Sequence, residues 1–393
     1  MNFLFSYKET YKFNIFSILG LRISIEKKNK NYEIKVINIT NKKIYNKKIA
    51  IYFDSGIGDY MFLRPFLPYI RNYYKNDKIT FIGSIRFKDI VLFFDKEYID
   101  EYIYFYGNDY HYEQLKDFFK NANYDLLISH YYLRMTQLDK IIETIDAKEK
   151  IGNYGGLLNL TKRQRVSNTN IYTKIIYPDE NDKFEIDRNK DFFTELLNGC
   201  NISIKNLEIN LDKNYFNNIN FNFAEKYAII FPSATDINRQ WKADNFKKVC
   251  DHLYYKYNII SYIVGSKNDV ELADTIKRNS EYIKNICGKY KLHELFFIFN
   301  KAKIVITNDS AGYHIAMSTS KNIIVISSGG SYIRFTNYPE KYKKDKIVST
   351  PIPEDANNKI DMEYFYDNEF LNTITYEQIC NLIDNKYKIY LTD

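Results

Sequence analysis

The stretch Ile304-Val-Ile-Thr-Asn-Asp-Ser-Ala-Gly-Tyr-His-Ile-Ala-Met317 has the pattern of a buried strand that runs directly into a helix. Apolar residues 304–306 predict the strand, and the polar break at 308–310 separates it from the predicted helix. A helix that begins at the end of a strand can bind an anion, because its first backbone N–H groups lack partners and its dipole is positive there. The stretch therefore predicts a strand–helix unit with an anion site at its junction.

Several residues at this junction are candidates for ligand binding. Asp309 and Ser310 are good N-cap residues. Ala311 and Gly312 leave room for a ligand to approach, and His314 lies one turn further along the helix. An ordinary capped helix would show the same residues, so the junction alone leaves both interpretations open.

Strands alternate with helices on both sides of this junction. In the second half, predicted strands at 226–231, 259–264 and 322–326 alternate with predicted helices at 243–257, 270–278 and 292–300. In the first half, predicted strands at 49–53, 78–83 and 125–129 accompany helical runs at 113–119 and 184–197. Such alternation is typical of parallel sheets covered by helices, so the fold class is α/β.

The chain length suits two domains of this kind. The sequence has 393 residues, of which 45% are hydrophobic and 27% charged, as expected of a globular protein. Residues 205–223 are rich in Asn and Asp and show little periodicity, which indicates a linker. We therefore expect an N-terminal extension over 1–47, a first domain over 48–204, the linker, a second domain over 224–350, and a tail with a helix over 351–393.

Composition also narrows the classes of partner and compartment. The net charge is +7, but no basic-aromatic motif of a nucleic-acid module is present, so no nucleic acid is expected as a partner. The cysteines form neither a metal pattern nor a disulfide framework, which favours a reducing cytoplasm. No Asp-x-Asp pair and no His/Cys/Asp cluster with metal spacing occurs in the sequence, so no metal is expected.

The N-terminal extension has two interpretations. Phe13–Ile25 is apolar but shorter than the roughly 20 residues that span a bilayer, and the mostly basic run Glu26–Lys30 follows it. An apolar patch beside lysines suits the surface of an anionic membrane. An added element packed on the first domain would explain the same residues.

The first predicted strand ends in the turn Asp54-Ser55-Gly56-Ile57-Gly58-Asp59. A dinucleotide fingerprint fails here, because Met61 occupies the third glycine position and the second strand ends at Ser84 without an acid for a ribose. Ligands of open α/β sheets bind at the carboxyl ends of strands, where Asp59 could take a proton from an attacking hydroxyl. Asp59 could equally cap the following helix.

Two charged residues of the second half lie after predicted strands. Arg239 lies in a loop near Trp241, and its guanidinium suits a phosphate, although a solvated surface charge is an equal alternative. Asp269 follows the strand that ends at Gly265, where it could meet a ribose or sugar hydroxyl or cap the next helix.

As an ordered set, these motifs resemble glycosyltransferase family 9, the lipopolysaccharide heptosyltransferase family. The matching segments are Ile49–Asp59 through Pro65, Pro232-Ser233-Ala234 with Arg239-Gln-Trp241, Val264-Gly265 with Asp269, Cys287-Gly288-Lys289 with Leu292–Leu295, and Asn308–His314. Ser233 and Ala311 replace glycines that are common in the family, and Arg239 stands where lysine is common. The methyl group of Ala311 bears on which donor sugar fits.

The resemblance implies a GT-B fold, in which two Rossmann-like α/β/α domains face a central cleft, with the last helix returning to the first domain. It implies that Asp59 is the general base and that Ser55, Gly56 and Gly58 form the acceptor-side loop. It assigns donor binding to Ser233, Arg239, Asp269, Asp309, Ser310, Ala311, Gly312 and His314.

The implied reaction is an inverting, metal-independent transfer of a heptose or related sugar. The donor would be a nucleotide-sugar such as ADP-heptose, and the acceptor a lipopolysaccharide or lipooligosaccharide core or a similar glycan. We expect a cytoplasmic protein, with peripheral contact to the inner face of the membrane through the extension. A sugar-nucleotide epimerase of GT-B architecture and a non-catalytic sugar-nucleotide-binding protein are the alternatives.

Overall fold

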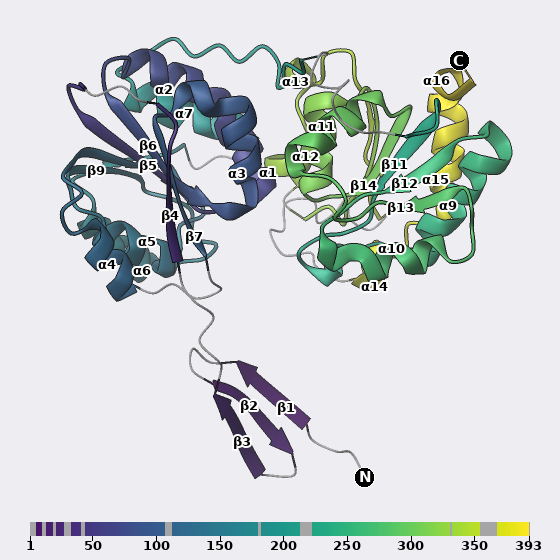
Figure 1. Ribbon diagram of the computed structural model, residues 1–393, viewed down its shortest axis with the longest axis horizontal. Helices are drawn as coiled ribbons and strands as arrows, with labels where there is room; N and C mark the ends of the chain where they lie inside the picture. Colours follow the sequence, from purple (N-terminus) through teal and green to yellow (C-terminus); the bar gives the residue numbers. More distant parts are fainter. Residues whose placement is uncertain are drawn as a thin grey trace.

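The computed structural model describes residues 5–9, 13–18, 21–26, 33–40, 44–106, 112–179, 182–212, 222–330, 332–353 and 368–392. Two α/β domains lie side by side in it (Figure 1). A separate antiparallel sheet is formed by β1 (Phe5–Glu9), β2 (Phe13–Ile18) and β3 (Leu21–Glu26). The apolar part of the extension therefore forms strands, while residues 27–30 of the basic run lie outside the described residues.

The first domain is built on a sheet of strand order β10-β9-β8-β5-β6-β7-β4. Its strands are β4 (Glu33–Asn38), β5 (Lys48–Phe53), β6 (Lys78–Ser84), β7 (Glu101–Tyr106), β8 (Tyr124–Ser129), β9 (Ala147–Asn153) and β10 (Lys174–Ile176). All neighbours are parallel except β4, which pairs antiparallel with β7. The expected boundary at residue 48 is therefore too late, because β4 forms one edge of this sheet through its pairing with β7.

Helices cover both faces of this sheet. Figure 1 shows α2 (Leu67–Tyr73) and α7 (Glu185–Leu196) on one side, and α4 (Tyr112–Phe119), α5 (Thr136–Thr144) and α6 (Lys162–Asn168) on the other. The helix predicted after β5 is divided. It begins as α1 (Ile57–Leu63), passes through a 3-10 turn with Pro65, and continues as α2, because proline disturbs the regular hydrogen-bond ladder.

The second domain has a parallel sheet of order β13-β12-β11-β14-β15-β16. Its strands are β11 (Tyr227–Phe231), β12 (Ile260–Ile263), β13 (Ile283–Asn285), β14 (Ile304–Asn308), β15 (Asn322–Ile326) and β16 (Ile347–Ser349). Its main helices are α9 (Ala243–Tyr257), α10 (Val270–Lys277), α11 (Leu292–Lys301) and α12 (Ala311–Thr319). Both faces are buried, because Ala228 and Ile230 join the core with α9, while Ile229 faces the core with α12.

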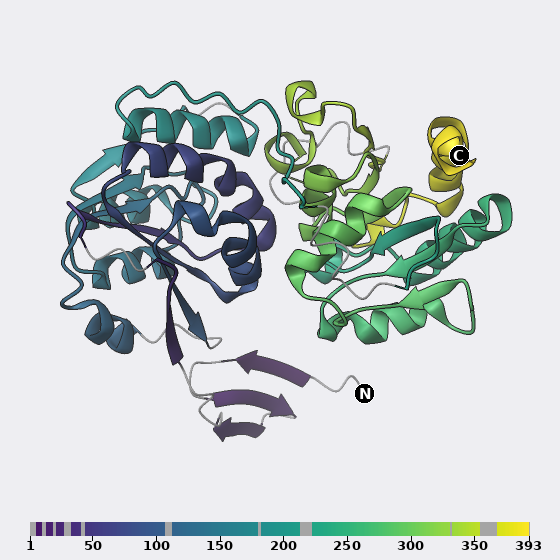
Figure 2. The ribbon, with the colours of Figure 1, turned by 45° about the horizontal axis from the view of Figure 1, so that its top comes forward.

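The C-terminal tail packs on the second domain. It contains α15 (Tyr376–Leu382), a π-helical turn over Ile383–Tyr387 and α16 (Lys388–Thr392). Asp384 accepts hydrogen bonds from Lys256 (2.6 Å) and Tyr257 (2.5 Å) of α9, and the Tyr387 hydroxyl donates to the Ile323 carbonyl (2.8 Å). Figure 2 shows this tail on the side of the second domain away from the first. The expectation that the last helix returns to the first domain is wrong.

One cluster of buried apolar residues runs from the first domain to one face of the second-domain sheet. The domains therefore share packed surface as well as a linker. Among the described residues, no helix is both long enough and apolar enough to cross a membrane.

Candidate functional site

The two domains meet where α1 packs against α12. Gly58 of α1 approaches His314 so closely that an added Cβ atom would lie 2.6 Å from the ring's Cδ2 atom. The Phe62 ring meets the same imidazole edge to face, with 4.8 Å between ring centroids. His314 Nδ1 shares a 2.8 Å hydrogen bond with the Tyr338 hydroxyl. His314, predicted as a donor ligand, is thus part of the domain contact.

A cavity of about 700 Å³ opens between the domains beside this contact. From the first domain it is lined by Ile57, Arg86 and Asp89. Its second-domain wall lies at the carboxyl ends of β11, β12 and β14, where ligands of open α/β sheets bind. Four residues predicted for donor binding line it: Ser233, Asp269, Ser310 and Ala311.

The N-terminus of α12 faces this cavity without a side-chain cap. Ser310 occupies the N-cap position, but its hydroxyl donates to the Ser233 carbonyl (3.0 Å), and no described side chain caps the helix. The first amides of α12 can therefore serve an anion, as the sequence predicts. Gly312 lies on the inner side, where a Cβ atom would come within 2.4 Å of the Phe231 ring, so glycine lets α12 sit close to β11.

Asp309 and Arg239 are not among the residues that line this cavity. Asp309 Oδ2 accepts hydrogen bonds from Ser327 (2.8 Å) and Thr336 (2.5 Å), while Oδ1 has no hydrogen-bond partner among the described residues. The Arg239 guanidinium donates to the Asp309 main-chain carbonyl and lies 3.9 Å from Oδ1. Arg239 therefore holds the loop that precedes α12, and its side chain keeps 32% exposure.

Asp269 lines the cavity and also caps a helical turn. Its Oδ2 atom accepts hydrogen bonds from the main-chain N–H (2.6 Å) and the hydroxyl (2.7 Å) of Ser266. Both sequence interpretations of Asp269 are thus compatible with its position, since the capping bonds use one carboxylate oxygen.

Asp59 lies on the first turn of α1, two residues after the cavity-lining Ile57. Its Oδ2 atom accepts hydrogen bonds from the Ser55 hydroxyl (2.6 Å) and the Gly56 N–H (3.2 Å). Burial raises the pKa of the Asp59 carboxyl, and the Ser55 hydrogen bond only partly opposes this shift. Asp59 itself does not line the cavity. The turn fixes its carboxylate, which is more basic than that of an exposed aspartate.

Sequence reasoning missed the charged side chains that complete the cavity lining. Arg86 and Asp89 follow β6, and Lys267 and Lys291 come from the second domain. Each of them follows a strand at the carboxyl edge of its sheet, and this position could have predicted a role in ligand binding. The chain has so many lysines that the pattern does not stand out in the sequence. Together with the α12 amides, the cations make this cavity suitable for a phosphorylated ligand.

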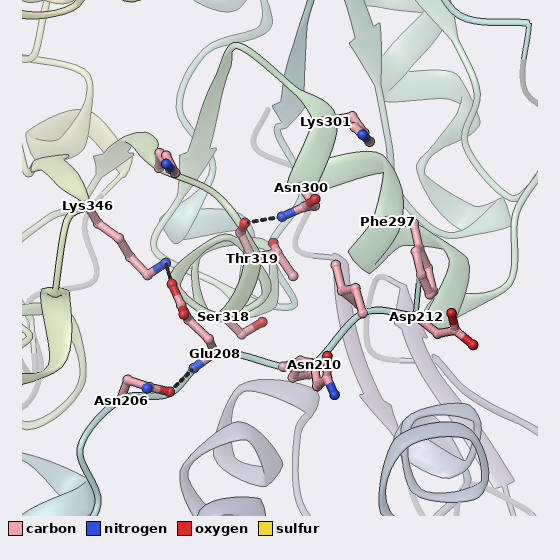
Figure 3. A pocket seen from close by; sticks show the side chains of 13 residues that line it. Asn206, Glu208, Asn210, Asp212, Phe297, Asn300, Lys301, Ser318, Thr319 and Lys346 are labelled. Carbon is pink, nitrogen blue, oxygen red and sulfur yellow. Dashed lines mark hydrogen bonds and ion pairs between the residues drawn. The ribbon is translucent and has the colours of Figure 1, made fainter. Parts of the chain in front are cut away.

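A second cavity of about 640 Å³ lies between the linker and the ends of α11 and α12 (Figure 3). Glu208 of the linker pairs with Lys346 (3.2 Å), and the Asn300 amide donates to the Thr319 carbonyl (2.9 Å). This cavity borders the residues that lead into β14 and β15, so it lies at the amino ends of those strands. Ligands of such sheets bind at the opposite edge, and we assign this region to linker docking.

Within the described ranges, no group of three or more His, Cys, Asp or Glu side chains could hold a metal ion.

Comparison with known proteins places these features in context. Residues 162–358, about half of the chain, match glycosyltransferase family 9 (heptosyltransferase). This range includes the Arg239 loop, Asp269 and the 308–314 junction, but not Asp59. The lipopolysaccharide heptosyltransferase 3 of Escherichia coli strain K12 is 29% identical over 119 residues, which are 30% of this chain and 35% of that protein. The chain thus matches only about a third of that relative's length.

Solved structures with the same fold cover nearly the whole chain. A family 9 glycosyl transferase from Veillonella parvula has a TM-score of 0.66 at 18% identity, covering 90% of this chain and 99% of its own. The E. coli ADP-heptose lps heptosyltransferase II has a TM-score of 0.64 at 14% identity, covering 88% and 98%. These similarities confirm the predicted GT-B fold.

Proposed function

Because the chain belongs to glycosyltransferase family 9, the heptosyltransferase family, we propose that it transfers a heptose or related sugar from a nucleotide-sugar to a glycan acceptor. The observation that carries this proposal is the interdomain cavity, which has the uncapped N-terminus of α12 on one wall and Ile57 of α1 on the other. Asp59 does not line this cavity but lies two residues after Ile57 on the same turn, which would put a carboxylate base at the edge of the anion site.

The second domain would bind the donor, for which ADP-heptose is the first candidate. The amides at the start of α12 and the cations Lys267 and Lys291 suit its diphosphate. Asp269 suits a ribose or sugar hydroxyl through the carboxylate oxygen that does not cap. Arg239 would contribute indirectly, because its guanidinium holds the Asp309 loop that positions these amides. As the sugar–phosphate bond breaks, the same groups would stabilise the charge of the leaving nucleoside diphosphate.

The first domain would bind the acceptor and supply the base. In the proposed inverting step, an acceptor hydroxyl attacks the anomeric carbon, its proton passes to the Asp59 carboxylate, and the nucleoside diphosphate departs with the electron pair of the broken bond. Ser55 and Gly56 hold this carboxylate in place, and Gly58 lets the second domain approach it. Stabilisation by α12 amides and side-chain cations is the basis for proposing that no metal is needed.

We also propose the acceptor class and the location. A lipopolysaccharide or lipooligosaccharide core, or a related glycolipid, is the expected acceptor, and a cytoplasmic protein at the inner face of the membrane would meet it. The net charge of +7 supports contact with an anionic membrane surface.

A substitution of Asp59 tests the proposal most directly. A thermal-shift screen of nucleotide-sugars first identifies the donor, since a ligand of the folded state raises the melting temperature. With that donor and a truncated core acceptor, Asp59→Asn should lower turnover by about a hundred- to ten-thousand-fold while donor affinity stays unchanged. The control is Asp117→Asn, an exposed carboxylate on α4 of the same domain.

Retained turnover in Asp59→Asn would overturn the assignment of the base. Product analysis with donor alone addresses the reaction class, because an epimerase would convert the donor without acceptor. Donor binding without turnover on any core acceptor would instead indicate a binding protein. Activity that survives chelator treatment and exhaustive dialysis is the expected result for a metal-independent transfer.

A further inference from the structure

An ion pair joins the two domains at the start of α7, the helix that packs on α1 and donates from the Asn189 side-chain amide to the Phe62 carbonyl (3.2 Å). Arg334, on the π-helical turn η8 (Tyr332–Thr336) of the second domain, places Nε 2.6 Å from Oε2 of Glu185, the first residue of α7. The two side chains are only 12% and 11% exposed. The low exposure distinguishes this pair from a solvated surface contact, whose strength would be small.

A second arginine and a tyrosine fix the geometry of the pair. Arg188 Nε lies 3.8 Å from the same Glu185 oxygen. The guanidinium groups of Arg188 and Arg334 lie 3.7 and 5.0 Å from the centre of the Tyr132 ring. Burial alone would raise the pKa of Glu185, but the charge and hydrogen bond of Arg334, with the charge of Arg188, hold this pKa below its usual value. Glu185 is therefore ionised while Arg334 is in contact with it.

Few charges reach Asp59 from the elements around it. Burial raises the pKa of Asp59, the Ser55 bond lowers it, and Glu185 and Arg334 then act in opposite directions. His314 of α12 and His130 after β8 are neutral near pH 7, because burial lowers the pKa of each to about 4. Among the described residues of other elements, Glu185 and Arg334 therefore have the largest charge effects on Asp59.

The members of the pair belong to different domains, whereas Asp59 and Glu185 belong to the same one. We infer that Arg334 is a positioning residue that compensates the Glu185 charge beside Asp59 when the domains are in contact, and so readies the base for proton transfer. When the domains separate, Arg334 leaves and the Glu185 carboxylate stays near Asp59. The base then retains its proton more readily and is poorly suited to activate an acceptor. This inference rests on the proposed role of Asp59.

The test is the pH dependence of kcat/KM for the acceptor at saturating donor. Arg334→Gln leaves the negative charge of Glu185 uncompensated and so raises the pKa of Asp59. The acidic limb of the kcat/KM profile should therefore move to higher pH by about one unit. Glu185→Gln leaves a lone cation and should move the limb to lower pH. Arg334→Gln/Glu185→Gln removes both charges, so its acidic limb should return toward that of the wild type. This variant also lacks the ion pair between the domains, so the result separates the effect of charge from that of the contact. Arg334→Lys keeps the charge and should stay near the wild type.

Lys341→Gln is the matched control. Lys341 pairs with Asp187 of α7 (2.6 Å), so its loss also removes an ion pair between the domains, but one that is not among the main charge effects on Asp59. Its acidic limb should not move.

The outcomes separate the two proposals. If Asp59→Asn is inactive but the limb stays fixed in Arg334→Gln and in Glu185→Gln, the inference on the ion pair fails and the base assignment stands. If Asp59→Asn retains turnover, the base assignment itself fails. If Arg334→Gln is too unstable to assay, the downward shift in Glu185→Gln decides alone, and its absence overturns the inference.

Discussion

Gly58 of the first domain and His314 of the second are in direct contact, and a single methyl group on Gly58 would lie 2.6 Å from the imidazole. Gly58 directly precedes Asp59 on α1. His314 lies one turn into α12, the helix whose N-terminus faces the cavity. The spacing between the two halves of the site is thus set by a glycine and a buried ring.

Gly58→Ala should lower the rate of transfer by forcing α1 and α12 apart. In a helix, alanine is more stable than glycine by up to about 1 kcal/mol. A loss of stability or rate would therefore come from the overpacked contact with His314, which typically costs about 1–3 kcal/mol. Steady-state kinetics and thermal melting measure both effects. Removing the ring in Gly58→Ala/His314→Ala should recover part of the loss relative to additive single effects. Wild-type kinetics in Gly58→Ala would contradict the prediction.

Arg239→Ala should weaken donor binding by roughly 1.5–3 kcal/mol, the usual range for a charged hydrogen bond. The lost bond to the Asp309 carbonyl would release the loop that leads into α12. Calorimetric titration with the donor gives the affinity. Arg278→Ala, which removes an exposed arginine from the end of α10 in the same domain, is the control and should bind normally. If Arg239→Ala bound the donor as tightly as Arg278→Ala, the proposed role of Arg239 in donor binding would be wrong.

Arg86→Gln should lower donor affinity about fivefold, near 1 kcal/mol, because this arginine lines the cavity but is exposed. The effect would show that the first domain contributes a cation to the bound donor. Arg163→Gln, on α6 of the same domain, changes the net charge equally and should leave the affinity unchanged. A similar loss in both variants would point to long-range charge instead of contact.

Gly312→Ala should destabilise the second domain by about 1–3 kcal/mol, because the new Cβ atom would lie 2.4 Å from the Phe231 ring. Thermal melting measures the change. Ala311→Gly alters the neighbouring position on the cavity side, so it should change donor selectivity more than the melting temperature. Adding Phe231→Leu to Gly312→Ala should restore part of the stability, and failure to do so would contradict the proposed contact.

Stability should fall as the pH drops from about 6.5 toward 4. Burial lowers the pKa values of His130 and His314 to about 4, so the folded state binds fewer protons than the unfolded state in this window. Their contribution is fully present above the unfolded pKa, and each loses up to ~1.4 kcal/mol per pH unit below it. His130→Phe keeps an aromatic ring beside Phe53 and should show a shallower loss of melting temperature with acid. If the melting temperatures of the wild type and His130→Phe fell in parallel with pH, protonation of His130 would not be the cause of the loss.

The sequence by itself determined the α/β alternation and the motifs at the ends of strands. Strand 304–308, the helix after it and the turn that holds Asp59 depend on local periodicity and on glycine, proline and polar residues, which act over a few neighbours. The same local information placed Ser233, Asp269, Ser310 and Ala311 at the carboxyl edge of the sheet. It also led to the correct fold through the resemblance that the ordered motifs carry.

Only the tertiary structure decided how those motifs face one another. It turned His314 to the domain contact, set Arg239 behind the Asp309 loop, placed β4 in the first sheet and packed the tail on α9. It also brought Glu185 to Arg334, which is 149 residues away in sequence. These relationships arise from packing and charge between segments far apart in the chain, so no local pattern records them.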